Sequence, residues 1–383
     1  MAVTTVQSNN KLVKYTQEIN REWVRENLFS PYMGEDMTSI IRRKMELKAG
    51  GEQMNIPLVT RLTGAGRGAG TLAGNEEKID NYGQRVWLDW ARHAVVTNKA
   101  EQQKDSADIF GEAKPLLSDW MKELQRDELI AALMALPSES SPTNLGTDSG
   151  QRVNGILYDE ATAAQRNTWT SDNSDRVLFG NSTANYSATH ATALATLDST
   201  NDKLTAANLA LLKRVAMGAN PKIRPYKTRD GYEYYVAFAG TNTFRDLKSS
   251  LETVNKDARP REGSGMDKNP LFQDGDQIYD GVIVRQVPEI SSFVTNVWTS
   301  MTTAGSTANR VEPVFLCGQQ AAVFAIGQMA KPTFRKEDDY GFITGTGIET
   351  AYGVSKVFKK HPSSGTKLVQ FGVATGFFAS ATD

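Results

Sequence analysis

The sequence has little of the side chains that cross-link a chain or bind transition metals: among its 383 residues there is one cysteine, Cys317, and three histidines. A single cysteine excludes an intramolecular disulfide and a cysteine-rich metal site, and it suits a reducing cytosol. His93, His190 and His361 lie far apart, and none has a second histidine within one helical turn, which is a spacing that zinc sites use. The sequence therefore predicts no metal site and no cofactor.

An excess of one charge and a long apolar run are also missing. The 43 Lys and Arg residues balance 44 Asp and Glu residues, for a net charge of -1, so no overall field attracts the protein to nucleic acid or to acidic membranes. The longest apolar run, Leu129 to Leu136, is far shorter than the roughly 20 residues that cross a bilayer. The first residues lack a secretory signal pattern. We expect a folded protein that stays where it is made and does not enter a membrane.

Three short motifs suggest ligand sites, and none fits its pattern. The glycine-rich string at 64–70 has neither the Lys-Ser/Thr of a phosphate loop nor the GxGxxG spacing, which favours a flexible loop tip. The acidic string at 274–280 fails the EF-hand pattern at three positions, so a solvated turn is favoured over a calcium site. The string GSG at 263–265 lacks the preceding strand of a nucleophile elbow. No motif in the sequence therefore supports an enzymatic function.

Paired charges are equally unspecific. Neither Asp127-Glu128 nor Asp338-Asp339 stands out as an acid-base pair. The basic runs 42–44, on a predicted helix, and 359–361 could contact phosphates, although solvated faces are the more frequent explanation of such runs.

Hydrophobic periodicity predicts an alternation of helices and strands. The region 138–203 is polar and predicts a loop-rich, exposed insertion, and 261–276 predicts a long loop. A capping box is expected at Thr243 and Asp246, and a buried face of the longest helix at Trp120 and Leu124. Helices are predicted at about 12–23, 37–45, 106–136, 205–217, 244–254 and 321–329, and strands at 53–62, 85–90, 232–238, 282–287, 314–317 and 369–377.

The two strands that flank the glycine-rich segment predict a long hairpin with a mobile tip. A two-stranded arm is marginally stable alone in water, so we expect this one to rest on something else, such as another chain.

Four stretches, together with the order of the elements, resemble the tailed-phage major capsid proteins of the Hong Kong 97 fold, and within them the coat proteins of N-four-like podophages. They are LTAANLALLKRVAMGANPKIRPY at 204–226, YYVAFAGTNTFRDLKSS at 234–250, NPLFQDGDQIYDGVIVRQVPEI at 269–290 and FLCGQQAAVFAIGQ at 315–328.

This resemblance implies an α+β fold with five parts. They are an N-terminal arm (1–52), an extended hairpin loop over a neighbouring subunit (53–98), a peripheral domain with the spine helix 106–136 and the polar insertion (99–203), an axial domain at the centre of each pentamer or hexamer (204–350), and C-terminal strands that return to the peripheral domain (351–383).

The resemblance also implies a function and partners. Many copies would close into an icosahedral shell around packaged double-stranded DNA, with weak non-specific DNA contacts and no catalytic, cofactor-binding or metal-binding residue. A separate scaffolding protein, a portal and a decoration protein are the further partners it allows. The protein would be made in the bacterial host cytoplasm and end in the virion. Two alternatives remain: an encapsulin-like compartment with protein cargo, and a soluble hydrolase that uses a carboxylate cluster.

Overall fold

The computed structural model describes residues 27–45, 52–59, 62, 64, 66–79, 81–104, 111–227, 231–257, 277–335, 339–361 and 365–380. The predicted helix at 12–23, the predicted loop at 261–276 and Asp338 lie outside these residues. The chain divides into two units. The smaller comprises the described residues of Ala91–Gln125 and Met329–Thr350 with Asn27, and the larger comprises those of Leu28–Trp90, Arg126–Gln328 and Ala351–Asp383.

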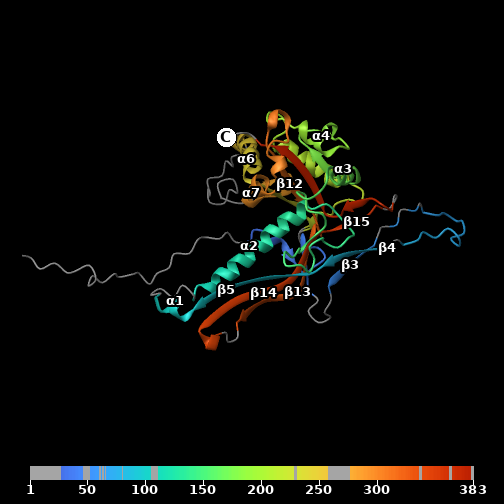
Figure 1. Ribbon diagram of the computed structural model, residues 1–383. Coiled ribbons are helices and arrows are strands. Elements are labelled where there is room, and N and C mark those ends of the chain that lie inside the picture. Colours follow the sequence, from blue (N-terminus) through green and yellow to red (C-terminus); the bar gives the residue numbers. More distant parts are fainter. Residues whose placement is uncertain are drawn as a thin grey trace, which may run out of the picture. The chain divides into compact units, whose positions relative to one another are not determined.

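The chain combines helices with mainly separate runs of strands, as in α+β folds (Figure 1). The helices are α1 (Lys99–Lys104), α2 (Ala113–Met134), α3 (Ala163–Asp172), α4 (His190–Ala195), α5 (Ala206–Gly218), α6 (Thr241–Asp257) and α7 (Pro288–Asn296). The strands are β1 (Met33–Gly34), β2 (Ile41–Met45), β3 (Gln53–Val59), β4 (Asn81–Trp87), β5 (Asp89–Asn98), β6 (Val153–Asn154), β7 (Val177–Phe179), β8 (Tyr226–Lys227), β9 (Glu233–Ala239), β10 (Gln277–Tyr279), β11 (Val282–Gln286), β12 (Val311–Cys317), β13 (Ala322–Phe334), β14 (Ile343–Lys356), β15 (Phe358–Lys360), β16 (Leu368–Gln370) and β17 (Val373–Ala379).

A seven-stranded mixed sheet forms the centre of the larger unit. Its order is β10-β11-β9-β12-β17-β7, with β8 beside β9. Every residue of β12 and of β17 is buried, because helices and other segments cover both faces of these central strands. Alternate side chains therefore point to opposite layers: Leu316 packs with α5 and α6, while Phe315 faces the other way. The predicted strands at 232–238, 282–287 and 314–317 are confirmed, whereas the predicted run 369–377 is divided between β16, which pairs with β15, and β17 of this sheet.

Helices α5 and α6 supply one layer of this core. Leu209 and Leu212 of α5 and Phe244, Leu247 and Leu251 of α6 pack in one cluster with the sheet. Their three-to-four-residue spacing is the pattern from which both helices are predicted, and both are confirmed.

The predicted capping box at the start of α6 is wrong. The helix begins at Thr241, before the expected cap, and the Thr243 hydroxyl donates to the carbonyl of Gly240. A buried carboxylate from β12, described below, lies at this helix start instead.

Two predicted helices are strands in the structure. The segment 37–45 contains β2, and 321–329 lies mostly in β13, and the two strands pair in parallel from Ile41↔Ala322 to Met45↔Ile326. The run 321–326 is apolar and buried throughout, so it gives no periodic signal for either structure, whereas the helical spacing within 37–45 is overridden by the pairing of β2 with β13. The six-stranded sheet that results has the order β1-β2-β13-β14-β5, with β6 beside β14.

The longest described helix is α2, which confirms the central part of the prediction at 106–136. Pro115 is its third residue, where a missing backbone N–H costs no hydrogen bond. The apolar end of α2 is buried as expected, with Leu129, Ile130 and Leu133 fully inaccessible. The expected burial of Trp120 and Leu124 is wrong, since both are half-buried; in the smaller unit the Trp120 ring lies 4.7 Å from that of His93.

The polar segment 138–203 is folded into the larger unit, against the expectation of an exposed insertion. Strand β7 pairs in parallel with β17 from Val177↔Thr375 to Phe179↔Phe377, so the segment supplies an edge strand of the seven-stranded sheet. Trp169 of α3 is buried and its ring lies 6.1 Å from that of Phe377. The few apolar residues of the segment 138–203 are enough to fold it, because the sheet supplies the rest of the core.

Candidate functional site

The base of the β3–β4 hairpin is anchored within its own chain. The strands pair antiparallel from Gln53↔Trp87 to Val59↔Asn81, which confirms the predicted hairpin. On β3, Met54, Ile56 and Leu58 are buried and the residues between them are exposed. The buried face packs with side chains of β4 and β13 and with Val357. The arm therefore rests partly on its own chain, and its second face is left open.

The tip of this hairpin is exposed throughout its described part. Every described residue from 62 to 79 is exposed, including the apolar Leu62, Leu72 and Ile79. Hydrogen bonds within the tip include those from the Gly64 N–H to Glu77 Oε2 at 2.7 Å and from Arg67 Nη2 to Asn75 Oδ1 at 2.5 Å. Figure 1 shows the blue hairpin projecting from the helices of its unit. The glycine-rich string is thus a loop tip, as predicted, and it is not built as a phosphate cradle at a helix start.

The smaller unit carries an unusual amount of exposed apolar surface. Its exposed large side chains are Val95, Val96, Leu116, Met329, Phe334, Tyr340 and Phe342. Its described buried hydrophobic residues are fewer and smaller: Ala91, Ala113, Leu117 and Met121. These exposed apolar side chains make the smaller unit a candidate for contact with other macromolecules.

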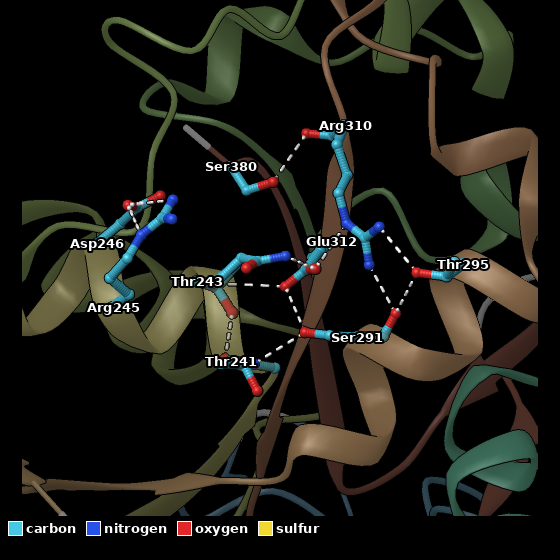
Figure 2. Close-up of polar contacts among 11 residues, drawn as sticks. Thr241, Thr243, Arg245, Asp246, Ser291, Thr295, Arg310, Glu312 and Ser380 are labelled. Atoms are coloured by element: carbon cyan, nitrogen blue, oxygen red, sulfur yellow. Dashed lines mark hydrogen bonds and ion pairs between the residues drawn. The ribbon is translucent and has the colours of Figure 1, made fainter. Parts of the chain in front are cut away.

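A buried polar cluster joins the start of α6 to α7 and β12 (Figure 2). Glu312 of β12 is fully buried, and its carboxylate accepts hydrogen bonds from Asn242 Nδ2 at 2.8 Å, Ser291 Oγ at 3.1 Å and Arg310 Nε at 2.9 Å. Its negative charge also lies at the positive end of α6, where the Thr243 N–H points at it at 3.4 Å.

Gly240 lies close against this cluster, and a larger residue there would displace its side chains. A Cβ there would lie 2.5 Å from Ser291 Oγ and 2.7 Å from Glu312 Oε2. Arg310 completes the cluster, since its Nη2 donates to the Ser291 carbonyl at 2.6 Å and its Nη1 to Thr295 Oγ1 at 2.9 Å. These hydrogen bonds link two helices and a strand, so the cluster helps to fix their relative positions.

His190 belongs to a second buried cluster and is not a metal ligand. Its Nε2 lies 3.0 Å from the Tyr158 hydroxyl and its Nδ1 lies 2.9 Å from the Thr170 hydroxyl, so both ring nitrogens are engaged. Burial, and to a smaller extent the charge of Arg166, lower its pKa to about 4. The imidazole is neutral at pH 7 and serves as a packed core side chain.

Two further buried charges show how the core treats ionisable groups. Burial lowers the pKa of Lys356 to about 7; its ammonium group donates to Gln370 Oε1 at 2.7 Å. Burial raises the pKa of Glu128, and the opposing pull comes from Arg152, whose Nη2 lies 2.6 Å from Glu128 Oε1. Burial also raises the pKa of the Cys317 thiol, which makes it unreactive.

The structure does not bring the residues that carry the sequence motifs into one site. Of the acidic string 274–280, residues 274–276 lie outside the described part, as does the string 263–265. The basic run 42–44 lies on the strand β2 and not on a helix. In the other run, Lys360 pairs with Glu139 at 3.0 Å and Lys359 is buried over the Phe371 ring.

No group of three or more metal-binding side chains occurs among the residues that the structure describes. Within the same residues, no helix combines the length and the apolar character that crossing a bilayer requires. The sequence reasoning missed Glu312 and Arg310, although a carboxylate and a guanidinium beside the apolar run of β12 were a visible signal of a buried pair.

Comparison with known proteins decides the family. A model of the family described as phage capsid protein matches residues 3–376. The chain belongs to the phage capsid protein family. No curated protein matches it.

Solved structures show the same fold along the complete chain. The capsid chain of cyanophage Pam1 is 34% identical with a TM-score of 0.85, and the match covers 100% of both chains. The capsid of Ralstonia phage GP4 is 17% identical with a TM-score of 0.68, over 100% of this chain and 99% of that one. The head structure of Helicobacter pylori bacteriophage KHP40 is 14% identical with a TM-score of 0.61, over 98% and 96%.

The expectations that the resemblance carries are therefore confirmed for the capsid family, the fold and the role, whereas the resemblance to the coat proteins of N-four-like podophages stays a prediction. The fold is the mixed α+β fold of the Hong Kong 97 type, and the chain is a tailed-phage major capsid protein. Each unit accordingly carries its own candidate assembly surface: the open face and tip of the hairpin in the larger unit, and the exposed apolar side chains of the smaller unit.

Proposed function

We propose that copies of this capsid protein assemble as pentamers and hexamers into an icosahedral shell that encloses the double-stranded DNA genome of a tailed phage. The observation that carries this proposal is the full-length match to the capsid chain of cyanophage Pam1, a structure described as a capsid asymmetric unit. The protein is a virion component, and it is made in the cytoplasm of the bacterial host.

The division of labour along the chain is part of the proposal. Residues 1–52 act as an N-terminal arm, 53–98 as a hairpin over a neighbouring subunit, 99–203 as the peripheral domain, 204–350 as the axial domain and 351–383 as strands returning to the periphery. The exposed Leu62, Leu72 and Ile79 of the hairpin tip support its role, because burying them against a second chain removes apolar surface from water. The uncovered side chains of the smaller unit support a second contact between subunits.

The proposed role is structural and not enzymatic. The carboxylates of Asp127 and Glu128, which are adjacent in the sequence, form ion pairs in the structure. Glu128 binds Arg152, and Asp127 binds Arg126 Nε at 2.9 Å. Contacts with DNA are weak and non-specific, which a net charge of -1 supports. A separate scaffolding protein, a portal and a decoration protein complete the set of proposed partners.

Two measurements test the proposal. Negative-stain microscopy of the purified chain should show closed shells of uniform size, and monomers or small oligomers under all assembly conditions would contradict it. Particles from the native source should hold genome-length DNA that is protected from nuclease. Shells that contain protein cargo and no such DNA would instead support the encapsulin-like alternative.

A further inference from the structure

A pocket of the larger unit has acidic and apolar walls. Its cavity volume is about 240 Å³, and it lies between the buried end of α2, the chain around β6 and the end of α7. Leu157, Tyr158, Phe293, Val297 and Trp298 form the apolar part of the lining. Asp127, Glu128, Gln151, Arg152 and Asp159 form the polar part.

Two polar groups of this lining lack a donor partner among the described residues, and both are acceptors. Gln151 is 7% exposed; its Nε2 donates to the Val153 carbonyl at 3.2 Å, while its buried Oε1 has no hydrogen-bond partner. The carboxylate of Asp159 is exposed and has no ion pair or hydrogen bond within the described chain. A buried acceptor without a donor is costly, so the pocket favours a ligand that brings N–H groups.

The one cation in the lining is already used. Arg152 donates from Nε to Glu128 Oε1 at 2.7 Å and from Nη1 to the Trp90 carbonyl at 2.8 Å, and its Nη2 lies 2.6 Å from the same Glu128 oxygen. It therefore compensates Glu128 and leaves the charge of Asp159 uncompensated. This lining is complementary to a positive group on an apolar stem that lies along Trp298 and Phe293.

The volume of the pocket favours a single side chain over a larger ligand. Pockets for drug-sized molecules measure about 300–1,000 Å³, whereas this one is smaller. We propose that the pocket receives the side chain of an arginine or lysine from a second copy of this chain in the shell. The inference rests on the proposed function, because a shell supplies such a neighbour to every subunit.

A first experiment tests the pocket on unassembled subunits and does not depend on shell formation. Isothermal titration with n-butylguanidinium should show saturable, roughly millimolar binding, while the neutral isostere n-butylurea should bind at least about tenfold more weakly, corresponding to 1.4 kcal/mol. The Asp159→Lys variant should lose the binding, and Glu160→Lys should keep it, because Glu160 is the adjacent exposed acid and does not line the pocket. Equal binding of the two compounds, or none at high millimolar concentration, overturns the proposal.

A second experiment tests the occupant. Asp159→Lys shells should disassemble at a lower urea midpoint than wild-type or Glu160→Lys shells, while the three unassembled subunits melt at the same temperature. Equal midpoints for the two variant shells would show that no neighbour's cation uses the pocket, even if the guanidinium probe binds. If the wild-type chain forms no shells, the proposed function fails by that result alone, and the titration still decides whether the pocket binds cations.

Discussion

Acid should destabilise the unassembled subunit through His190. The imidazole is 2% exposed, and both nitrogens are within hydrogen-bond distance of the Tyr158 and Thr170 hydroxyls. Above about pH 6.5 it is neutral in the folded and in the unfolded chain, so it adds no pH dependence there. As the pH falls below that value, the unfolded chain takes up a proton first, because the folded pKa is lowered to about 4. The folded state loses stability across this window.

The size of the effect follows from the two pKa values. The difference between 6.5 and about 4 corresponds to roughly 3 kcal/mol, fully developed once the pH is below about 4. A domain is typically stable by only about 5–15 kcal/mol, so this single group removes a substantial part of the margin. Urea unfolding of unassembled subunits at intervals between about pH 7.5 and 4 measures it.

Two variants separate the titration from the packing. His190→Gln cannot titrate, so its stability should fall less steeply than that of the wild type between pH 6.5 and 4, whatever its stability at pH 7.5. Tyr158→Phe keeps the imidazole and removes one hydrogen bond, so it should cost about 1 kcal/mol at all pH values and keep the slope. If His190→Gln and the wild type gave parallel pH profiles, the reasoning from burial would be refuted.

Three further predictions concern other parts of the chain. Proline at both Gly66 and Gly68 should leave subunit melting unchanged but reduce shell yield, because the tip is exposed and contacts itself; equally stable shells at normal yield, seen by microscopy and light scattering, would sink the idea. Leu133→Ala should lower the unfolding free energy by about 2–5 kcal/mol, since Leu133 is fully buried. Lys122→Glu, at an exposed position of the same helix, should change it by about 0.5 kcal/mol. Similar melting temperatures for the two variants would contradict this prediction. The pKa of the buried Lys356 amine is lowered to about 7, so between about pH 7 and 9.5 the unfolded chain holds a proton that the folded chain has lost, and stability should rise with pH. Lys356→Met should flatten this rise. Denaturation curves at both pH values measure the change, and an unchanged slope would count against the prediction.

Some elements follow from the sequence because their pattern depends on one buried face. The spacing of Phe244, Leu247 and Leu251 puts them on one side of a helix, and the alternation around Ile56 puts every second residue of β3 in the core. The composition around the glycine-rich string likewise predicts an exposed tip, since such a segment has no core of its own. The failure of each catalytic motif was also visible in the sequence, and the resemblance gave the family.

The tertiary structure decided the elements whose neighbours lie far along the chain. The segment 37–45 has helical spacing and the apolar run 321–329 is compatible with a buried helix, but the pairing of β2 with β13, far apart along the chain, makes both segments strands. The polar segment 138–203 folds because β7 joins a sheet whose other strands supply the apolar contacts.

The two buried clusters likewise could not be predicted from the sequence, because their partners come from distant parts of the chain. Whether Glu312 or His190 is buried depends on which helices cover it, and only the assembled core brings Arg310 and Ser291 to the first and Tyr158 and Thr170 to the second. Local spacing along a sequence reports which face of an element is apolar. Which distant element covers that face, and which polar groups are thereby forced to pair, is decided by the packing of the complete chain.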